Sequence, residues 1–385
     1  MQYVRLNELC NINIGKTPSR NKQIYWGKGL KWLSISDLKD KFINETKEQI
    51  TEKAISECNM KIVPKNTVVM SFKLSIGKVA ILKEDMYTNE AIANFPIKDD
   101  TKLIPEYLYY SIKTLNFTNT DRAVMGATLN KSKLNELKIP YCVVDKQNKI
   151  VNVLDKAQSL IDKRKDQIEA LDELVKSRFI EMFGDPIQNN KGWDKIAIGN
   201  KFQIKTGATP SRKENVYWEN GSIPWVKTTE LKEYVITETE EYITEEGFNN
   251  SAVNMLPKDT ILVAMYGQGK TRGMTGKLGI NATTNQACAA ILPNEDENMD
   301  FIWYQLRLLY NDLRDLGRGG NQPNLNTNLV KGYELIFPPI ELQNQFADFV
   351  KQVDKLKFEM EKSLKELEDN FNSLMQKAFN GELFN

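Results

Sequence analysis

Two long stretches of the chain carry apolar residues at alternating intervals of four and three positions. The first covers residues 150–182, and the second covers residues 349–378, with one widened interval between Met360 and Leu364. A spacing of about 3.5 residues is typical of a helix that buries one stripe against a partner helix. Neither stretch contains proline or glycine before Gly184 and Gly381, which stand where helices should end. The pattern therefore predicts two long helices.

The rest of the chain mixes short apolar runs with turns. Residues 67–72 and 260–265 are predicted to be strands, as are residues 78–82 and 287–292. Aromatic-rich segments at 107–112 and 301–306 are predicted to be helices that pack one face on a sheet. These elements indicate α+β globular domains.

The two halves of the chain repeat each other in order. The segment Thr17-Pro18-Ser19-Arg20 recurs as Thr209-Pro210-Ser211-Arg212, Tyr25-Trp26 recurs as Tyr217-Trp218, and Gln147-Asn148 recurs as Gln343-Asn344. One unit of roughly 190 residues is thus present twice, as in repeat architectures. The repeated prolines and tryptophans are in themselves more typical of turns and core than of contacts.

Each predicted helix can lie flat on its own domain, or the two can pair as a coiled coil. Two equivalent stripes, each longer than one domain needs, favour antiparallel pairing. We therefore predict an α+β fold with two tandem globular domains, residues 1–145 and 186–341, and two helices, residues 146–185 and 342–385, in an antiparallel coiled coil with pseudo-twofold symmetry. The predicted seam contains Leu154, Ala157, Ile161, Ile168, Leu171, Val175, Val353, Leu356, Met360, Leu364, Leu367, Phe371 and Leu374.

Composition narrows the chemistry. The chain has four widely spaced cysteines and no histidine, which disfavours a zinc site or a disulfide framework and points to reduced, cytoplasmic thiols. The missing histidines also remove the usual general base. No run is long and apolar enough for a membrane span, and the start does not read as a secretory signal. Residues 1–145 carry 22 basic and 16 acidic residues, whereas residues 190–341 carry 16 and 19.

One segment imitates a nucleotide-binding loop. Residues 264–271 fit a relaxed glycine-rich phosphate-loop pattern after a predicted strand. A true phosphate loop needs a helix directly after its Lys-Thr pair, and residues 272–276 are unsuited to begin one. A cationic loop that approaches DNA and a plain hairpin loop are the two readings left open. We predict no catalytic residue and no metal ligand.

Polar, glycine-containing tracts at 121–131 and 318–326 are suited to reading bases, because arginine pairs with guanine and asparagine or glutamine with adenine. Loops at 16–20, 73–78 and 268–277 add cations and hydroxyls for phosphate. For any single residue, a solvated loop is the competing interpretation. The candidate DNA-binding residues are Lys16, Thr17, Ser19, Arg20, Lys73, Ser75, Lys78, Arg122, Thr128, Asn130, Lys131, Thr209, Ser211, Arg212, Tyr266, Gln268, Lys270, Arg272, Arg318, Asn321, Gln322 and Asn324.

These features together resemble the specificity subunits of type I restriction–modification systems, over nearly the whole chain. The resemblance is carried by the repeated Thr-Pro-Ser-Arg and Tyr-Trp openings, by the helix entries from Ile139-Pro140 to Gln147 and from Phe337-Pro338-Pro339 to Gln343, and by the helix tails at 176–185 and 374–383.

The resemblance implies that residues 1–145 and 186–341 are target-recognition domains, each reading half of a split site on double-stranded DNA, with the helices as a ruler between them. It implies partners: two adenine-methyltransferase subunits and restriction or translocase subunits. It implies no cofactor in this chain, because S-adenosylmethionine, ATP and Mg²⁺ act in those partners. A protein-only scaffold of two modules on a coiled coil is the main alternative, and a nucleotide-dependent enzyme using Lys270 is a third.

Overall fold

The structure is a computed structural model, and it describes all residues except 116–120, 124–125, 130, 268, 318–323 and 385. The chain divides into two compact units, one formed by Met1–Lys165 with Lys362–Asn385 and the other by Asp166–Glu361. Each of the two long helices gives one segment to each unit. We call the globular part of the first unit domain 1 (residues 1–143) and that of the second unit domain 2 (residues 184–339).

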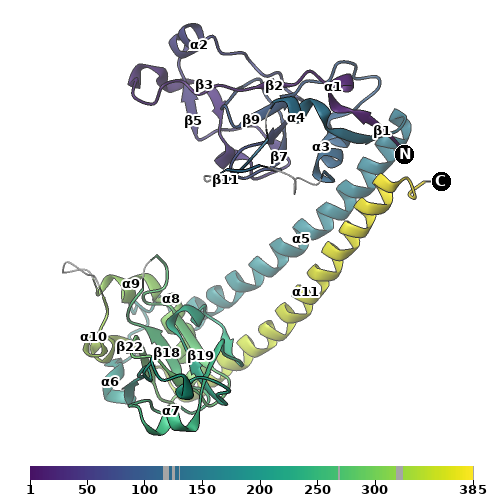
Figure 1. Cartoon of the computed structure of the whole chain (residues 1–385). Helices are drawn as coiled ribbons and strands as arrows, with labels where there is room; N and C mark the ends of the chain where they lie inside the picture. Colours follow the sequence, from purple (N-terminus) through teal and green to yellow (C-terminus); the bar gives the residue numbers. More distant parts are fainter. Residues whose placement is uncertain (116–120, 124–125, 130, 268, 318–323, 385) are drawn as a thin grey trace. The chain divides into compact units, whose positions relative to one another are not determined.

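Domain 1 is built on a five-stranded sheet and a three-stranded sheet (Figure 1). The larger sheet has the order β2 (Asn13–Ile14), β9 (Ile92–Phe95), β6 (Val68–Ser71), β7 (Val79–Leu82) and β4 (Phe42–Ile43). The smaller sheet has the order β5 (Glu48–Ile50), β3 (Trp26–Leu33) and β8 (Tyr87–Thr88). Two further pairs are β1 (Gln2–Arg5) with β12 (Lys138–Tyr141), and β10 (Asp121–Ala123) with β11 (Gly126–Thr128). The α-helices in the described part of this domain are α1 (Leu6–Leu9), α2 (Glu52–Cys58), α3 (Pro105–Lys113) and α4 (Lys131–Glu136).

Domain 2 repeats this topology. Its larger sheet has the order β14 (Ile204–Thr206), β21 (Cys288–Ile291), β18 (Ile261–Ala264), β19 (Thr275–Leu278) and β16 (Val235–Ile236), and its smaller sheet β17 (Glu241–Ile243), β15 (Ile223–Val226) and β20 (Thr283–Thr284). The pair β13 (Lys195–Ala197) with β22 (Glu334–Ile336) matches β1 with β12. The helices are α6 (Ile198–Lys201), α7 (Glu245–Asn249), α8 (Met299–Leu308), α9 (Tyr310–Asp315) and α10 (Thr327–Gly332). The duplication inferred from the sequence is therefore confirmed at the level of strand order.

The central strands are buried on both faces, which explains their unbroken apolar runs. In β6, Val68 and Met70 pack into the core that contains α3, whereas Val69 packs into a second core on the other face. In β18, Ile261 and Val263 share a core with α8, and the intervening Leu262 faces another. The predicted packing of α3 and α8 on one face of a sheet is confirmed.

Two long helices complete the fold, α5 (Val144–Phe183) and α11 (Ile340–Asn380). Both end at a glycine in the left-handed conformation, Gly184 with φ 77° and Gly381 with φ 87°, as the sequence predicts. Their starts lie slightly before the expected boundaries at residues 146 and 342. None of the helices in the described part of the chain is both long and apolar enough to cross a lipid bilayer.

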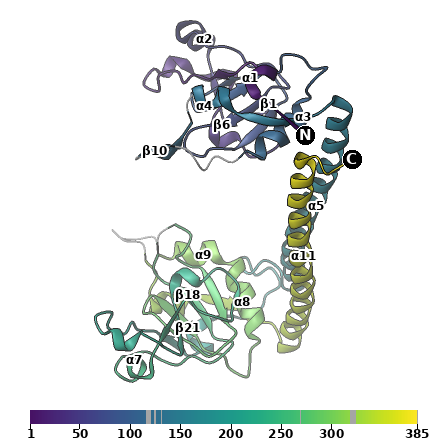
Figure 2. The same cartoon turned by 45° about the vertical axis from the view of Figure 1, so that its right-hand side comes forward.

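The two helices lie side by side within each unit (Figure 2). In the first unit, Leu154 and Ile161 of α5 share a core with Phe371 of α11. In the second unit, Val175 of α5 shares a core with Val353 of α11. Early residues of one helix thus meet late residues of the other, so the pairing is antiparallel, as predicted. These two cores together contain most of the predicted seam: Leu154, Ala157, Ile161, Leu171, Val175, Val353, Met360, Leu364, Leu367, Phe371 and Leu374.

Two seam predictions differ from the structure. Leu356 is 47% exposed, so its assignment to the seam is wrong. Its neighbour Lys357 takes the position: its side chain is only 27% exposed and its Nζ donates to Asp172 Oδ1 at 2.6 Å. A lysine can bury its stem and keep its charge satisfied, which an apolar pattern does not register. With Lys357 in place, the interval before Met360 becomes three residues, and the two consecutive intervals of four move to Phe349–Val353–Lys357. Ile168 is half-buried and belongs to neither core.

Candidate nucleic-acid interface

Two tryptophans of domain 1 hold the loop at residues 16–20. The Nε1 of Trp32 donates to the carbonyl of Lys16 at 3.0 Å, and the Nε1 of Trp26 donates to the carbonyl of Ser19 at 3.2 Å. The two rings pack edge to face, with centroids 4.9 Å apart. The indoles therefore fix the loop backbone while the side chains of Lys16 and Ser19 stay exposed.

The matching loop of domain 2 is held in the same way. The Nε1 of Trp225 donates to the carbonyl of Ala208 at 3.0 Å, and the Nε1 of Trp218 donates to the carbonyl of Ser211 at 3.1 Å. These rings also pack edge to face, with centroids 5.0 Å apart. The tryptophans, which the sequence indicated as core, thus also position the loops that were predicted to contact DNA.

Arg20 is engaged inside domain 1. Its Cζ lies 3.9 Å from the centroid of Trp26, and its Nη2 donates to Glu48 Oε2 at 2.9 Å. The hydrogen bond from Arg20 lowers the pKa of Glu48 below its ordinary value. Because the guanidinium is already stacked and paired, the structure gives Arg20 the role of bracing the loop. Its contact with DNA stays a prediction.

Arg212 repeats this arrangement in domain 2, with its Cζ 3.5 Å from the centroid of Trp218 and its Nη2 2.6 Å from Glu241 Oε2. Sequence reasoning missed both glutamates. They occupy equivalent places in the repeat: Glu48 lies on β5 of domain 1 and Glu241 on β17 of domain 2. The sequence signal that could have identified them is a glutamate that recurs in both halves together with the recurring arginine.

The structure brings the predicted base-reading tract of domain 1 next to its predicted phosphate loop. The amide of Leu129 donates to the carbonyl of Phe72 at 3.0 Å, which joins the tract to the start of the loop at 73–78. At the end of β6, just before that loop, the buried hydroxyl of Ser71 donates to the carbonyl of Ser75 and accepts from the amide of Lys78. In domain 2, the amide of Leu325 donates to the carbonyl of Met265 at 3.0 Å.

The glycine-rich loop of domain 2 is tied to α9. The Tyr310 hydroxyl donates to the carbonyl of Lys270 at 2.7 Å, and Arg314 donates to the carbonyl of Gly269. The next element along the chain is β19, so no helix follows the Lys-Thr pair, as predicted. This is not the geometry that a nucleotide-hydrolysing loop requires.

The individual candidates fare differently. Lys16, Ser19, Ser75, Lys78, Lys131, Ser211, Tyr266 and Lys270 are exposed, and Lys73 and Asn324 are half-buried. Thr17 and Thr209 donate to Glu90 and Gln286 of their own domains. Arg272 is buried, so the prediction that it contacts DNA does not fit the structure. Arg122 and Thr128 lie in β10 and β11, and Asn130, Gln268, Arg318, Asn321 and Gln322 lie outside the described residues.

A buried glutamine fastens the start of each long helix to its domain. Gln147 accepts from the amide of Ile104 and donates to the carbonyls of Lys102 and Cys142. Gln343 accepts from the amide of Asn298 and donates to the carbonyl of Pro338 and to Glu297. Each domain is therefore set on its helix by the same side chain.

Comparison with protein families decides what this duplicated surface belongs to. A family model described as "Type I restriction modification DNA specificity domain" matches residues 1–171 and again residues 190–369. The chain belongs to the specificity subunits of type I restriction–modification systems. The specificity subunit MjaIX of Methanocaldococcus jannaschii is 27% identical over 98% of this chain and 92% of its own length. The EcoR124I/EcoR124II specificity subunit of Escherichia coli is 23% identical over 67% of this chain and 65% of its own.

Solved structures agree with the fold of a specificity subunit. The crystal structure of the type I S subunit from M. genitalium matches with a TM-score of 0.54 and 17% identity, covering 98% of this chain and 96% of that one. A chain from a structural study of type I complex assembly and conformational transition matches with a TM-score of 0.64 and 15% identity, covering 99% and 98%. At these identities the likeness concerns the fold alone.

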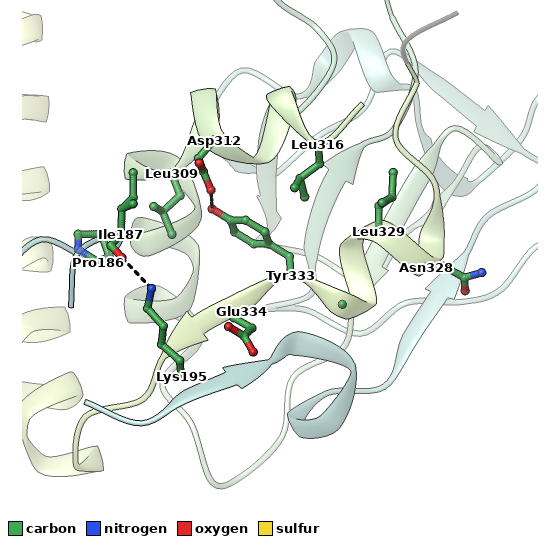
Figure 3. A pocket seen from close by; sticks show the side chains of 11 residues that line it. Pro186, Ile187, Lys195, Leu309, Asp312, Leu316, Asn328, Leu329, Tyr333 and Glu334 are labelled. Atoms are coloured by element: carbon green, nitrogen blue, oxygen red, sulfur yellow. Dashed lines mark hydrogen bonds between the residues drawn. The ribbon is translucent and has the colours of Figure 1, made fainter. Parts of the chain in front are cut away.

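A cavity of about 390 Å³ lies on domain 2 of this specificity subunit, and two of the polar side chains that line it are hydrogen-bonded within the domain (Figure 3). The Tyr333 hydroxyl donates to Asp312 at 2.8 Å, and the Nζ of Lys195 donates to the carbonyl of Ile187 at 2.7 Å. Burial and the adjacent Asp312 carboxylate raise the pKa of Tyr333 above its ordinary value, so the phenol stays a neutral donor. Among the residues that the structure describes, no group of three or more potential ligands is placed to hold a metal ion.

Proposed function

We propose that this chain recognises a split DNA site, one half with each domain, and carries the methyltransferase and restriction subunits of a type I complex without catalysing a step itself. The observation that carries the proposal is the duplicated loop scaffold. In both domains, the same tryptophan, arginine and glutamate contacts hold a loop, and the same backbone hydrogen bond joins the base-reading tract to its neighbour. Proteins with two equivalent reading units commonly address two half-sites on one duplex.

The helices are proposed to set the number of base pairs between the half-sites. Their antiparallel pairing within each unit, and the glutamine that fixes each domain on its helix, support this role. A rod of stable length between two readers converts helix length into distance along DNA.

The same helices are proposed to carry the partner subunits. Leu174 and Leu356 are both 47% exposed, and each stands one position before a seam residue, so in an antiparallel pair they line the same flank. Domain 2 packs against the flank that carries Phe179, which shares its core with Phe301. Exposed apolar side chains on a free flank suit a protein partner. S-adenosylmethionine, ATP and Mg²⁺ would then be used by those partners.

The deciding experiment maps methylated adenines across the genome of a host that carries this chain with its methyltransferase partner. We expect one motif with two specified parts and a fixed gap. Inserting one heptad into both helices should widen the gap by roughly three base pairs, because seven residues add about 10 Å and each base pair spans about 3.4 Å. A complex that methylates no split motif would refute the proposal and favour a protein-only scaffold. An unchanged gap would refute the ruler alone.

A further inference from the structure

A cavity of about 290 Å³ lies on domain 1 between the loop at residues 16–20 and the end of the base-reading tract. Three lysines from separate segments line it: Lys16 from the loop, Lys61 after α2, and Lys131 at the start of α4. All three are exposed, and the lining residues that the structure describes include no carboxylate. Three lysines around one cavity, with no carboxylate among its described lining residues, favour an anion at this place.

Two further features of the cavity concern the contacts of Lys16 and Asn94. The Nζ of Lys16 donates to the carbonyls of Cys58 and Asn59, at 3.3 and 3.2 Å, which anchors the ammonium at the rim. Asn94 also lines the cavity. It is only 2% exposed, and its Oδ1 is buried with no hydrogen-bond partner. A buried acceptor without a partner is costly, and an ordered water brought in by a ligand would satisfy it.

Domain 2 replaces each of these residues, position by position. Lys16 and Ala208 make the same amide hydrogen bond, to Thr88 and Thr284. Lys61 and Asn254 each stand two residues before an equivalent bridge, at Val63 and Leu256.

Lys131 and Thr327 each stand two residues after the amides of Leu129 and Leu325, which make equivalent bonds. Asn94 pairs with Asn13 in its sheet, whereas Ala290 pairs with Lys205. Domain 2 therefore has no lysine at the three equivalent positions, and its Lys205 stands where domain 1 has Asn13.

We propose that the cavity lined by Lys16, Lys61 and Lys131 binds a phosphate group of the DNA backbone, and that domain 2 has no counterpart of this site. The inference rests on the proposed function, because it assumes that the adjacent tract faces DNA. Lysine serves as a point charge for phosphate, and a phosphate contact carries no base-sequence information. The cavity thus anchors the duplex on domain 1 and leaves base recognition to the neighbouring loops.

The test uses the complex of this chain with its methyltransferase partner, bound to a duplex that carries its methylated motif, across a range of salt concentrations. The variant Lys16→Ala, Lys61→Asn, Lys131→Thr installs the residues that domain 2 has at the same positions. We expect its affinity to fall about tenfold at low salt and equally for all base sequences, and the slope of log K against log salt to fall by about one. The matched control, Lys28→Ala, Lys39→Asn, Lys47→Thr, removes the same charge outside the cavity and should leave the slope unchanged.

Several outcomes would overturn the inference. The inference is wrong if the salt slope of the cavity variant equals that of the wild type. It is also wrong if the control variant loses as much of the salt slope as the cavity variant. Titration with inorganic phosphate without DNA tests the other source: if phosphate binds the wild type but not the variant, while DNA affinity is equal, the cavity serves a free anion.

If the variant fails to fold, as a thermal unfolding midpoint would reveal, the reverse exchange decides. Ala208→Lys, Asn254→Lys, Thr327→Lys should raise the salt slope by about one, and an unchanged slope would count against the site. A wild-type complex that does not prefer its motif refutes the proposed function instead. Each outcome named above that counts against the inference requires a wild-type complex that does prefer its motif, so the two failures are distinguishable.

Discussion

The two domains share the bonds that hold their loops and differ in the side chains that the loops present. Trp32 and Trp225 make the same hydrogen bond to a loop carbonyl, and Arg20 and Arg212 stack on equivalent rings. At the surface, domain 1 gathers lysines around a cavity, whereas domain 2 presents a glycine-rich loop braced by α9. Duplication has therefore kept the scaffold while the side chains around it diverged. Under the proposed function, this divergence would allow the two domains to recognise different half-sites.

The domain–helix contacts differ as well. In the first unit, Asp155 of α5 accepts from Lys41 and from the hydroxyl of Tyr110, the latter at 2.5 Å. In the second unit, the helix supplies the cation: the Nζ of Lys351 lies 3.9 Å from Asp300 of α8. The polarity is reversed, so each domain is matched to its own helix. Opposed like charges would disfavour exchange between them.

The largest effect is expected when residues 1–140 are replaced by those of another specificity subunit, which tests whether the two domains act independently. We expect one half of the methylated motif to change completely, and the other half and the gap to stay the same, because the scaffold bonds of each domain close within it. Methylome sequencing reads both halves at once. Alteration of both halves would mean that the domains do not read separately.

Because the two domains share one scaffold, we expect equivalent substitutions in the two domains to reduce stability equally. A Cβ on Gly15 would overlap the carbonyl of Thr88, and a Cβ on Gly207 would overlap that of Thr284. Gly15→Ala and Gly207→Ala should each destabilise their own domain by about 3 kcal/mol, because a backbone oxygen cannot be displaced easily. Limited proteolysis with mass mapping would locate the loosened domain. Gly332→Ala is a control for added methyl bulk, since its Cβ would meet nothing within 4 Å and its φ is not positive. Damage to only one domain would break the equivalence.

A smaller effect is expected when the stacked arginines are removed. Arg20→Ala and Arg212→Ala should each cost about 1 kcal/mol, since both side chains are half exposed and solvent screens the ion pairs. The pKa of Glu48 is lowered by its bond to Arg20, so this stabilisation is present above the ordinary value of 4.5 and is lost as the pH falls through the lowered pKa. Thermal unfolding of wild type and Arg20→Ala should therefore converge at acid pH. A constant difference would contradict the ion pair.

The smallest effect is expected in the seam. Lys357→Leu should change stability by less than about 1 kcal/mol, because lost pairing with Asp172 is offset by apolar burial. Leu356→Lys is the matched control at the exposed neighbouring position and should be nearly neutral. Calorimetry on the purified chain without its partner subunits measures both, because Leu356 also lies on the flank that is proposed to bind those partners. A large loss at position 356 would restore Leu356 to the seam.

A structural feature could be predicted only where it leaves a recognisable pattern in the sequence. The long helices and buried strands were predictable because apolar periodicity records burial directly, and the repeat records equivalence of position. Lys357 was missed because a lysine stem packs without leaving an apolar mark. Lys61 and Asn94 were missed because Lys16, Lys61, Asn94 and Lys131 come from distant segments and meet only after the sheet forms. Burial of Arg272 depends likewise on packing that composition does not encode.

The charged pair of Lys357 and Asp172 has a consequence for alignment. If one helix shifted by one heptad along the other, most apolar residues would still face apolar residues. Apolar contacts alone therefore do not exclude this shift. The same shift would move Asp172 out of reach of Lys357 and lose this ion pair, so the pair adds a modest preference for the observed register. The pair therefore favours a single register of the two helices. If the helices set the gap between half-sites, as proposed, a single register corresponds to a single gap.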